Sequence, residues 1–116
     1  MGGKILILED QPLVLQTIKK VLEKVGYDTI AVSSGPECLE ALARGPYDLF
    51  IADLHVPGVD TDALCSRVRA SSPDVKFLFV SGAAPPAGRL PFLQKPFRIE
   101  DLRKTVKEIL SGIRGI

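Results

Sequence analysis

Short apolar runs alternate along this chain with longer stretches in which apolar residues recur every three or four positions. Runs of branched and aromatic residues are typical of buried strands, and the longer spacing is typical of amphipathic helices. Because strands that alternate with helices favour a sheet covered on both faces, the pattern predicts an α/β protein with a doubly wound, five-stranded parallel sheet. The predicted strands are 4–8, 29–32, 48–52, 75–80 and 92–94.

Three helices are predicted between these strands and one after the last strand. Proline suits a first helical turn, and glycine suits a helix stop. The predicted helices run from Pro12 to about Val25, from Gly35-Pro36 to before Gly45-Pro46, from an Asp60 cap to about Ser71, and from about Glu100 to Ile113. Their apolar positions are Val14, Ile18, Val21, Leu22 and Val25, then Leu39 and Leu42, then Leu64 and Val68, and finally Leu102, Val106, Ile109, Leu110 and Ile113.

The segment between the fourth and fifth strands has a different composition. Between Gly82 and Pro91 it contains two further prolines, Pro85 and Pro86, and a second glycine, Gly88. Prolines remove backbone donors, and glycines raise the entropic cost of ordering the chain. We therefore predict a loop here rather than a regular helix.

Length and composition narrow the class of protein. A chain of 116 residues has the size of one domain, which we expect to cover 1–116. Its composition, with 46% hydrophobic and 25% charged residues, is ordinary for a globular protein. The net charge is only +1 and the Lys and Arg residues are spread along the sequence, so no basic patch for binding nucleic acid or an anionic membrane is indicated. With no apolar run long enough to cross a bilayer, the expected location is the cytoplasm. Cys38 and Cys65 lie outside any metal-ligand spacing, so both are expected to be reduced packing residues.

Polar residues follow the predicted strands where each one ends. Glu9 and Asp10 follow the first, Asp53 the third, Ser81 the fourth and Lys95 the fifth. Ligands of open parallel sheets bind outside the carboxyl ends of the strands, so these groups converge if their strands are neighbours. Packed carboxylates repel one another, and an all-oxygen ligand set suits Mg²⁺. The sequence thus points to Mg²⁺-assisted chemistry on a phosphoryl group.

Four motifs in order resemble the receiver domains of bacterial response regulators, the CheY-like domains of two-component signalling. They are ILILED at the first strand, FIADLHVPGVD around the third, FVSGA at the fourth and FLQKPF at the fifth. The resemblance covers nearly the whole chain. It implies a flavodoxin-like sheet of order 2-1-3-4-5 and transfer of a phosphoryl group from a phosphohistidine onto one aspartate. The implied partner is a histidine kinase or a histidine phosphotransfer protein.

The resemblance also implies a role for each site residue. Asp53 matches the phosphorylated residue and a metal ligand, Asp10 the direct metal ligand and Glu9 its partner. The backbone carbonyl of His55 matches the third protein ligand. Ser81 and Lys95 match the groups that contact the phosphoryl oxygens. Ser81 and Phe92 match the pair of switch residues in the family. Pro96 matches a proline of the family, and we predict that its bond to Lys95 is cis.

Each assignment competes with a simpler interpretation. Asp53 and Ser81 are both residue types that are common in turns, and Lys95 could be a solvated surface charge. Phe92 could be a plain core residue of a strand. For His55, the only histidine, the carbonyl is preferred over the imidazole, which could still influence phosphoryl lifetime or metal choice.

Three other functions compete with that of a receiver domain. A phosphatase of the haloacid-dehalogenase kind needs a second Asp two residues after the first, where His55 stands. A degenerate receiver would lack acceptor or metal positions, and all of them are filled here. A nucleotide-binding site has no GxGxxG or GxxxxGK[ST] motif to support it. The expected function is that of a monomeric phosphoacceptor and not of an enzyme.

Two features depart from the family pattern. Thr61 stands where a glycine is common, which affects a loop but removes no ligand. Lys95 follows Ser81 by only 14 positions, fewer than is usual. The family's fourth helix should therefore be shortened or absent, and we expect partners to dock on the side of the first helix instead.

Overall fold

The computed structural model describes residues 2–84 and 91–112, and it contains a five-stranded sheet in which neighbouring strands run parallel in the order β2-β1-β3-β4-β5. This is the predicted flavodoxin-like order. The strands are β1 (Lys4–Leu8), β2 (Asp28–Val32), β3 (Leu49–Asp53), β4 (Lys76–Ser81) and β5 (Phe92–Gln94). The helices are α1 (Pro12–Glu23), α2 (Gly35–Ala41), the short 3₁₀ turn η1 (Leu42–Arg44), α3 (Thr61–Ser71) and α4 (Ile99–Leu110).

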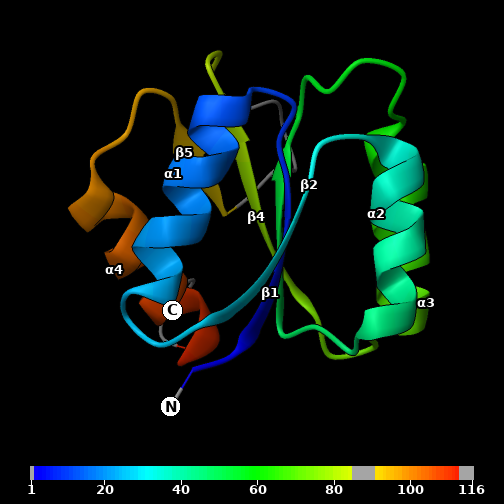
Figure 1. Ribbon diagram of the computed structural model, residues 1–116, viewed down its shortest axis with the longest axis horizontal. Coiled ribbons are helices and arrows are strands. Elements are labelled where there is room, and N and C mark those ends of the chain that lie inside the picture. The colour runs from blue at the N-terminus through cyan, green and yellow to red at the C-terminus, as the bar shows by residue number, and fades with distance from the viewer. Residues whose placement is uncertain (1, 85–90, 113–116) are drawn as a thin grey trace.

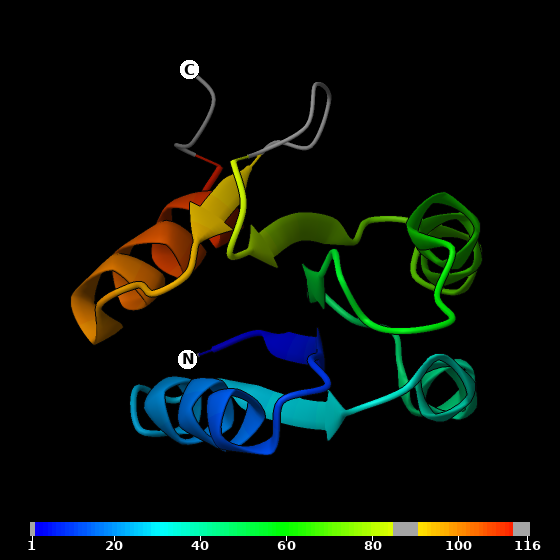
Figure 2. The same cartoon turned by 90° about the horizontal axis from the view of Figure 1, so that it is seen from above.

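Helices cover both faces of the sheet. Helices α1 and α4 lie on one face, and α2 and α3 lie on the other (Figures 1 and 2). Successive residues of a strand point to opposite faces, so Ile5 and Ile7 of β1 pack with α1 and α4, whereas Leu6 and Leu8 pack on the α2 and α3 side. The buried strands β1 and β3 can therefore be apolar at nearly every position.

The first helix ends earlier than predicted. It stops at Glu23 rather than near Val25, and the chain turns back through Gly26, whose φ is +97°. The amide of Tyr27 donates to Leu22, which closes this turn and leaves Val25 48% exposed. Val25 was therefore wrongly assigned to the apolar stripe, and the buried residue that the prediction missed is Leu15.

Other boundaries shift by one or two residues. Strand β3 begins at Leu49 and includes Asp53, and the side chain of Asp48, just before it, accepts a hydrogen bond from the Lys4 amide. In α2 the buried residues are Cys38 and Ala41, while Leu39 is 38% exposed. The last helix ends at Leu110. The predicted position 113 lies outside the described residues.

The two cysteines are packing residues, as predicted. Cys38 of α2 and Cys65 of α3 are buried thiols, outside any disulfide, in the same apolar layer. Burial raises the pKa of the Cys38 thiol to about 12, and the nearby Cys65 adds to the effect. A thiol held neutral in this way is inert as a nucleophile.

Between β4 and β5 the described residues 82–84 and 91 are not helical. The remainder of the predicted loop, 85–90, lies outside the described residues. Among the helices that are described, none has the length and apolar character needed to span a membrane.

Candidate functional site

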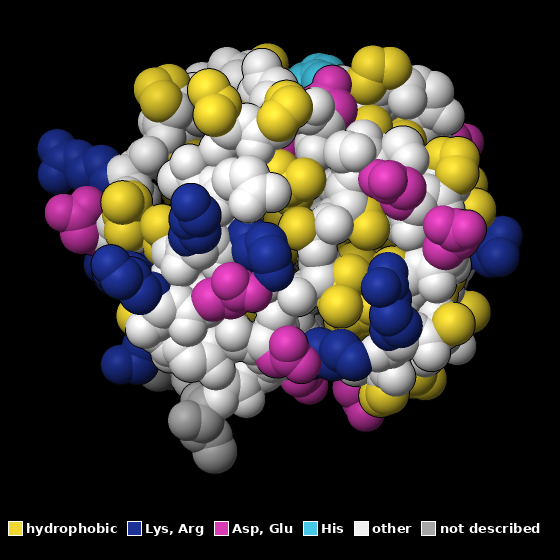
Figure 3. All heavy atoms as spheres, in the orientation of Figure 1, with side chains coloured by type: hydrophobic (Ala, Val, Ile, Leu, Met, Phe, Trp, Pro, Cys, Tyr) yellow, Lys and Arg dark blue, Asp and Glu magenta, His cyan; other side chains and the backbone are white. Residues whose placement is uncertain are grey.

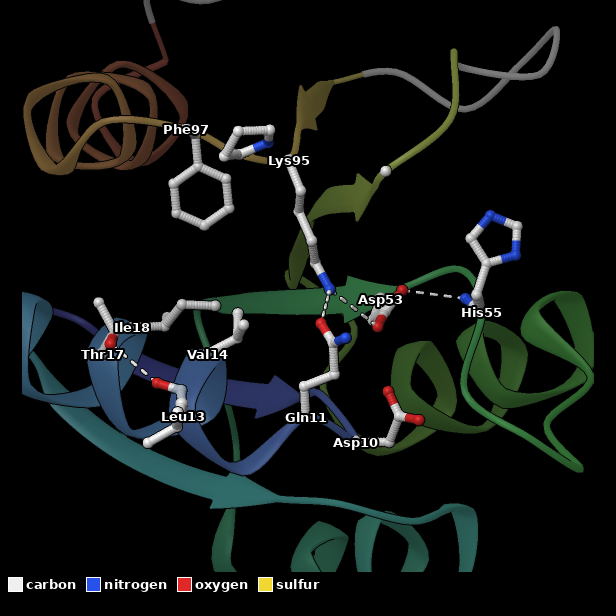
Figure 4. A pocket seen from close by; sticks show the side chains of 12 residues that line it. Asp10, Gln11, Leu13, Val14, Thr17, Ile18, Asp53, His55, Lys95 and Phe97 are labelled. Atoms are coloured by element: carbon white, nitrogen blue, oxygen red, sulfur yellow. Dashed lines mark hydrogen bonds and ion pairs between the residues drawn. The ribbon is translucent and has the colours of Figure 1, made fainter.

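The carboxyl ends of the strands carry the candidate site, at the top of Figure 1. Here β1 leads into Glu9 and Asp10, β3 ends at Asp53, and Lys95 directly follows β5. An open cleft of about 680 Å³ lies at this edge, and the side chains of Lys95, Gln11 and Asp53 face one another in it in Figure 4. Its lining residues are Asp10, Gln11, Leu13, Val14, Thr17, Ile18, Asp53, His55, Gly82, Lys95, Pro96 and Phe97.

Glu9 is a fully buried carboxylate beside the cleft. Its Oε2 accepts a hydrogen bond of 3.0 Å from the backbone amide of Gln11, and its Oε1 lies 2.6 Å from Lys95 Nζ as an ion pair. Burial raises the pKa of Glu9 above its ordinary value, and the charge of Asp53 acts in the same direction. The bonds from Lys95 and Gln11 oppose this rise without cancelling it. The ionised form of Glu9 is thus energetically unfavourable at this buried position.

Asp53 lies at the end of β3 with a side chain that is 4% exposed. Its Oδ1 accepts a hydrogen bond of 3.0 Å from the backbone amide of His55, and its Oδ2 lies 3.2 Å from Lys95 Nζ. Both oxygens therefore have a donor, and the carboxylate is held in one orientation at the cleft.

Lys95 connects the carboxylates. Burial alone would lower its pKa, but the hydrogen bond to Glu9 and the charges of Asp53 and Glu9 outweigh burial and raise the pKa. The ammonium therefore stays charged at neutral pH. Lys95 lines the cleft with 17% of its side chain exposed, so it is not a solvated surface charge.

The three acidic residues are close enough to share a cation. Glu9, Asp10 and Asp53 each offer a carboxylate oxygen, and these oxygens all lie within 4.8 Å of one another. Glu9 Oε1 is buried and forms no hydrogen bond of good geometry, although it is paired with Lys95. An all-oxygen set with an under-used buried oxygen fits a hard divalent cation.

Ser81 and Phe92 lie near the site without reaching into it. Ser81 is buried at the end of β4, and its Oγ accepts a hydrogen bond of 3.1 Å from the Ala83 amide. Phe92 is half-buried opposite Phe79, and it packs on the α2 and α3 side. In the part of the chain that the structure describes, the Ser81 hydroxyl has no acceptor, so it can donate its proton to an incoming group.

His55 takes part through its backbone. Its amide holds Asp53, whereas its imidazole is exposed and points away from Asp53 in Figure 4. The role of its carbonyl as a metal ligand stays a prediction. The Lys95–Pro96 peptide bond is cis, which is the predicted isomer, and the Gly45–Pro46 bond is cis as well.

Gln11 is a site residue that sequence reasoning missed. Its Oε1 accepts a hydrogen bond of 3.2 Å from Lys95 Nζ. The available signal was its position, directly after the acidic pair and at the start of a helix. A polar residue there is usually interpreted as a helix cap.

Comparisons with known proteins agree with this geometry. A model of the response regulator receiver domain matches residues 5–107. The chain is 34% identical over 120 residues to the sensor kinase CckA of Brucella abortus. This match covers 95% of the chain and 13% of the kinase. It is 30% identical over 115 residues to the response regulator receiver protein CpdR of the same species, with 92% and 96% covered. A CheY-like receiver domain protein from Methanospirillum hungatei has a solved structure with a TM-score of 0.85 at 25% identity, and 97% of each chain is covered.

Proposed function

We propose that this chain, which belongs to the response regulator receiver domain family, accepts a phosphoryl group on Asp53 from the phosphohistidine of a histidine kinase or a histidine phosphotransfer protein. The observation that carries the proposal is the position of Asp53 at the cleft, buried at the end of β3 and 3.2 Å from the ammonium of Lys95. Such a chain acts in two-component signalling as a phosphoacceptor and does not turn over a substrate.

The residues around Asp53 suit the chemistry of the transfer. One Asp53 oxygen forms a bond to phosphorus while the phosphorus–nitrogen bond of the phosphohistidine breaks, and the departing nitrogen keeps the electron pair. Lys95 supplies a fixed positive charge to the phosphoryl oxygens, and the Ser81 hydroxyl supplies a hydrogen-bond donor. Fixed charges and donors that face the reacting group contribute most of the catalysis in phosphoryl transfer.

We assign the acidic cluster to Mg²⁺. Glu9, Asp10 and Asp53 would hold the ion, with the backbone carbonyl of His55 as a further ligand. The bound ion would supply charge withdrawal from the phosphoryl oxygens and would keep Asp53 ionised. The supporting observation is that three carboxylate oxygens from two adjacent strands lie within 4.8 Å of one another.

The apolar side of the cleft is the proposed docking site for the partner. Leu13 of α1 is 84% exposed at this rim, and Pro96 and Phe97 line the cleft across from it. An exposed leucine beside a reactive carboxylate suits a partner helix that carries the phosphohistidine. On the face seen in Figure 3, basic and acidic side chains are interspersed, which supports a function without nucleic acid. We propose that the chain acts as a cytoplasmic monomer, with Ser81 and Phe92 as the switch residues.

The proposal is tested with acetyl phosphate, a small phosphoryl donor. The intact protein should gain the mass of one phosphoryl group when Mg²⁺ is present and should not gain it with excess chelator. Asp53→Asn should not gain this mass, because an amide cannot serve as the nucleophile. Undiminished phosphorylation of Asp53→Asn would place the acceptor elsewhere.

A further inference from the structure

Gln11 touches both members of the ion pair at the centre of the site. Its backbone amide donates to Glu9 Oε2 at 3.0 Å, and its side-chain oxygen accepts from Lys95 Nζ at 3.2 Å. Gln11 occupies the N-cap position of α1, yet its side chain makes no capping hydrogen bond. The side chain is therefore engaged with the site and not with its own helix.

The contacts of Lys95 show what Gln11 adds. An ammonium has three N–H donors, and Nζ has three oxygen neighbours: Glu9 Oε1 at 2.6 Å, Asp53 Oδ2 at 3.2 Å and Gln11 Oε1 at 3.2 Å. Two of these neighbours are carboxylates, and one of them, Asp53, loses its charge when it is phosphorylated. Gln11 is the neutral neighbour, and its contact does not depend on that charge.

Phosphorylation changes the surroundings of Lys95. When Asp53 is bonded to phosphorus, its carboxylate charge is gone, and the negative charge lies on the phosphoryl oxygens instead. Lys95 must then leave Asp53 Oδ2 and approach those oxygens. An ammonium already held from the α1 side by Gln11 needs only a small movement to do so, and this lowers the cost of reorganisation.

The orientation of the Gln11 amide follows from the same contact. Lysine offers only donors, so the oxygen of the amide must face Lys95, and the nitrogen faces another direction. In Figure 4 the amide lies beside Lys95 and Asp53 at the opening of the cleft. Among residues 2–84 and 91–112, none accepts a hydrogen bond from the Nε2 donors of Gln11. These donors are available to a group that enters the cleft.

We propose that Gln11 is a positioning residue of phosphoryl transfer. Its amide oxygen holds the Lys95 ammonium at the cleft, and its amide nitrogen donates to the phosphoryl group that arrives on Asp53. This inference rests on the proposed phosphorylation of Asp53. It adds a residue that recognises the phosphoryl oxygens from the α1 side, next to Lys95.

The first test compares Gln11→Met with the unaltered protein. Methionine has a similar length but lacks the amide, and the side chain is exposed, so the melting temperature should not change. With acetyl phosphate and Mg²⁺, the rate of phosphorylation should fall about threefold to tenfold, the effect of one lost hydrogen bond. Gln16→Met is the matched control, because Gln16 is an exposed glutamine of the same helix that does not line the cleft, and it should keep the full rate.

Two further measurements separate positioning from a structural effect. In a Lys95→Met background, Gln11→Met should cost much less than it does in the unaltered protein, because part of its action passes through Lys95. In the metal-free protein, NMR should show faster hydrogen exchange of the Lys95 ammonium in Gln11→Met. This second readout needs neither phosphorylation nor a folded Lys95→Met protein.

The possible failures are distinguishable. If the unaltered protein takes no phosphoryl group on Asp53, the proposed function is wrong. If it is phosphorylated normally but Gln11→Met leaves the rate and the Lys95 exchange unchanged, the positioning role is wrong. An equal loss of rate with and without Lys95 would also overturn it.

Discussion

Lys95 is the residue on which the electrostatics of the site depend. Glu9 is fully buried and Asp53 is 4% exposed, and the ammonium that lies between them is their shared counter-charge. Two carboxylates so close together cannot both stay ionised cheaply without a cation. A loss of this one side chain should therefore affect stability as well as function.

We predict that Lys95→Met lowers the free energy of unfolding at neutral pH by roughly 2 kcal/mol, since it leaves buried carboxylates without a partner. The pKa of Glu9 is already raised, and loss of the ammonium would raise it further. A carboxyl whose pKa is higher in the folded than in the unfolded protein contributes stability below its unfolded pKa and loses it as pH rises through the folded pKa. The deficit of the variant should therefore shrink as pH falls from 7 towards 4.

Urea unfolding at several pH values, with and without Mg²⁺, measures this deficit. Addition of Mg²⁺ should restore stability at neutral pH, because the ion replaces the missing positive charge. Lys19→Met is the control, because its pair with Glu23 is an exposed one between successive turns of α1, and its loss should matter little. A deficit for Lys95→Met that does not vary with pH or Mg²⁺ would contradict the prediction.

A separate prediction concerns Asp10 and the affinity of the site for Mg²⁺. It is the more exposed of the three acidic residues, and its replacement by alanine removes an anionic ligand without leaving a buried cavity. Mg²⁺ affinity, measured by calorimetric titration, should fall on the order of tenfold or more. Asp74→Ala, which removes an exposed aspartate before β4 at the other end of the sheet, should leave the affinity unchanged.

At the scale of elements, the β3–α3 loop connects the strand that ends at Asp53 to helix α3. Asp60 caps α3, as the sequence predicts, through a hydrogen bond of 3.2 Å from the Ala63 amide to Oδ1. Asp60→Ala should cost about 1 kcal/mol of unfolding free energy, measured with urea. Asp60→Asn keeps an acceptor oxygen and should retain most of this stability, so an equal loss in both variants would argue against the cap.

The elements also show where sequence patterns lose precision. The long, strongly periodic α1 and α4 are predicted with the correct faces, apart from Val25 at the end of α1 and the missed Leu15. In the seven-residue α2, Leu39 is the obvious apolar position, yet Cys38 and Ala41 are the ones buried. Such a short helix covers too few turns for the spacing to distinguish one face from its neighbour. At the start of β3, Asp48 accepts a hydrogen bond from Lys4, a contact between distant segments that no local pattern contains.

At the scale of the whole molecule, the order of the strands could not be obtained from periodicity. It came from the resemblance to receiver domains, and the sheet confirms it. Once β1 and β3 are neighbours, the convergence of Glu9, Asp10 and Asp53 follows, because parallel strands end at the same edge. Gln11 could not be found in this way, since its role depends on the reach of Lys95 from a strand at the other side of the site.

The arrangement of the molecule also separates the chemistry from the docking of a partner. Leu13 is exposed at the rim of the cleft and is not one of the acidic residues, so Leu13→Asp should leave phosphorylation by acetyl phosphate unchanged. Phosphoryl transfer from a phosphorylated histidine phosphotransfer protein should slow by about tenfold or more, because a buried apolar anchor at an interface is commonly worth that much.

The matched control is Leu39→Asp, which places the same charge at an exposed leucine of α2, on the other face of the sheet. Because that face is remote from the α1 rim, this variant should accept phosphoryl groups from both donors at the normal rate. Equal slowing by the two variants would mean that the partner approaches the cleft without using α1. Slowing of Leu13→Asp with acetyl phosphate as well would mean that the substitution damages the site itself, and that the α1 rim cannot be treated as a surface separate from the chemistry.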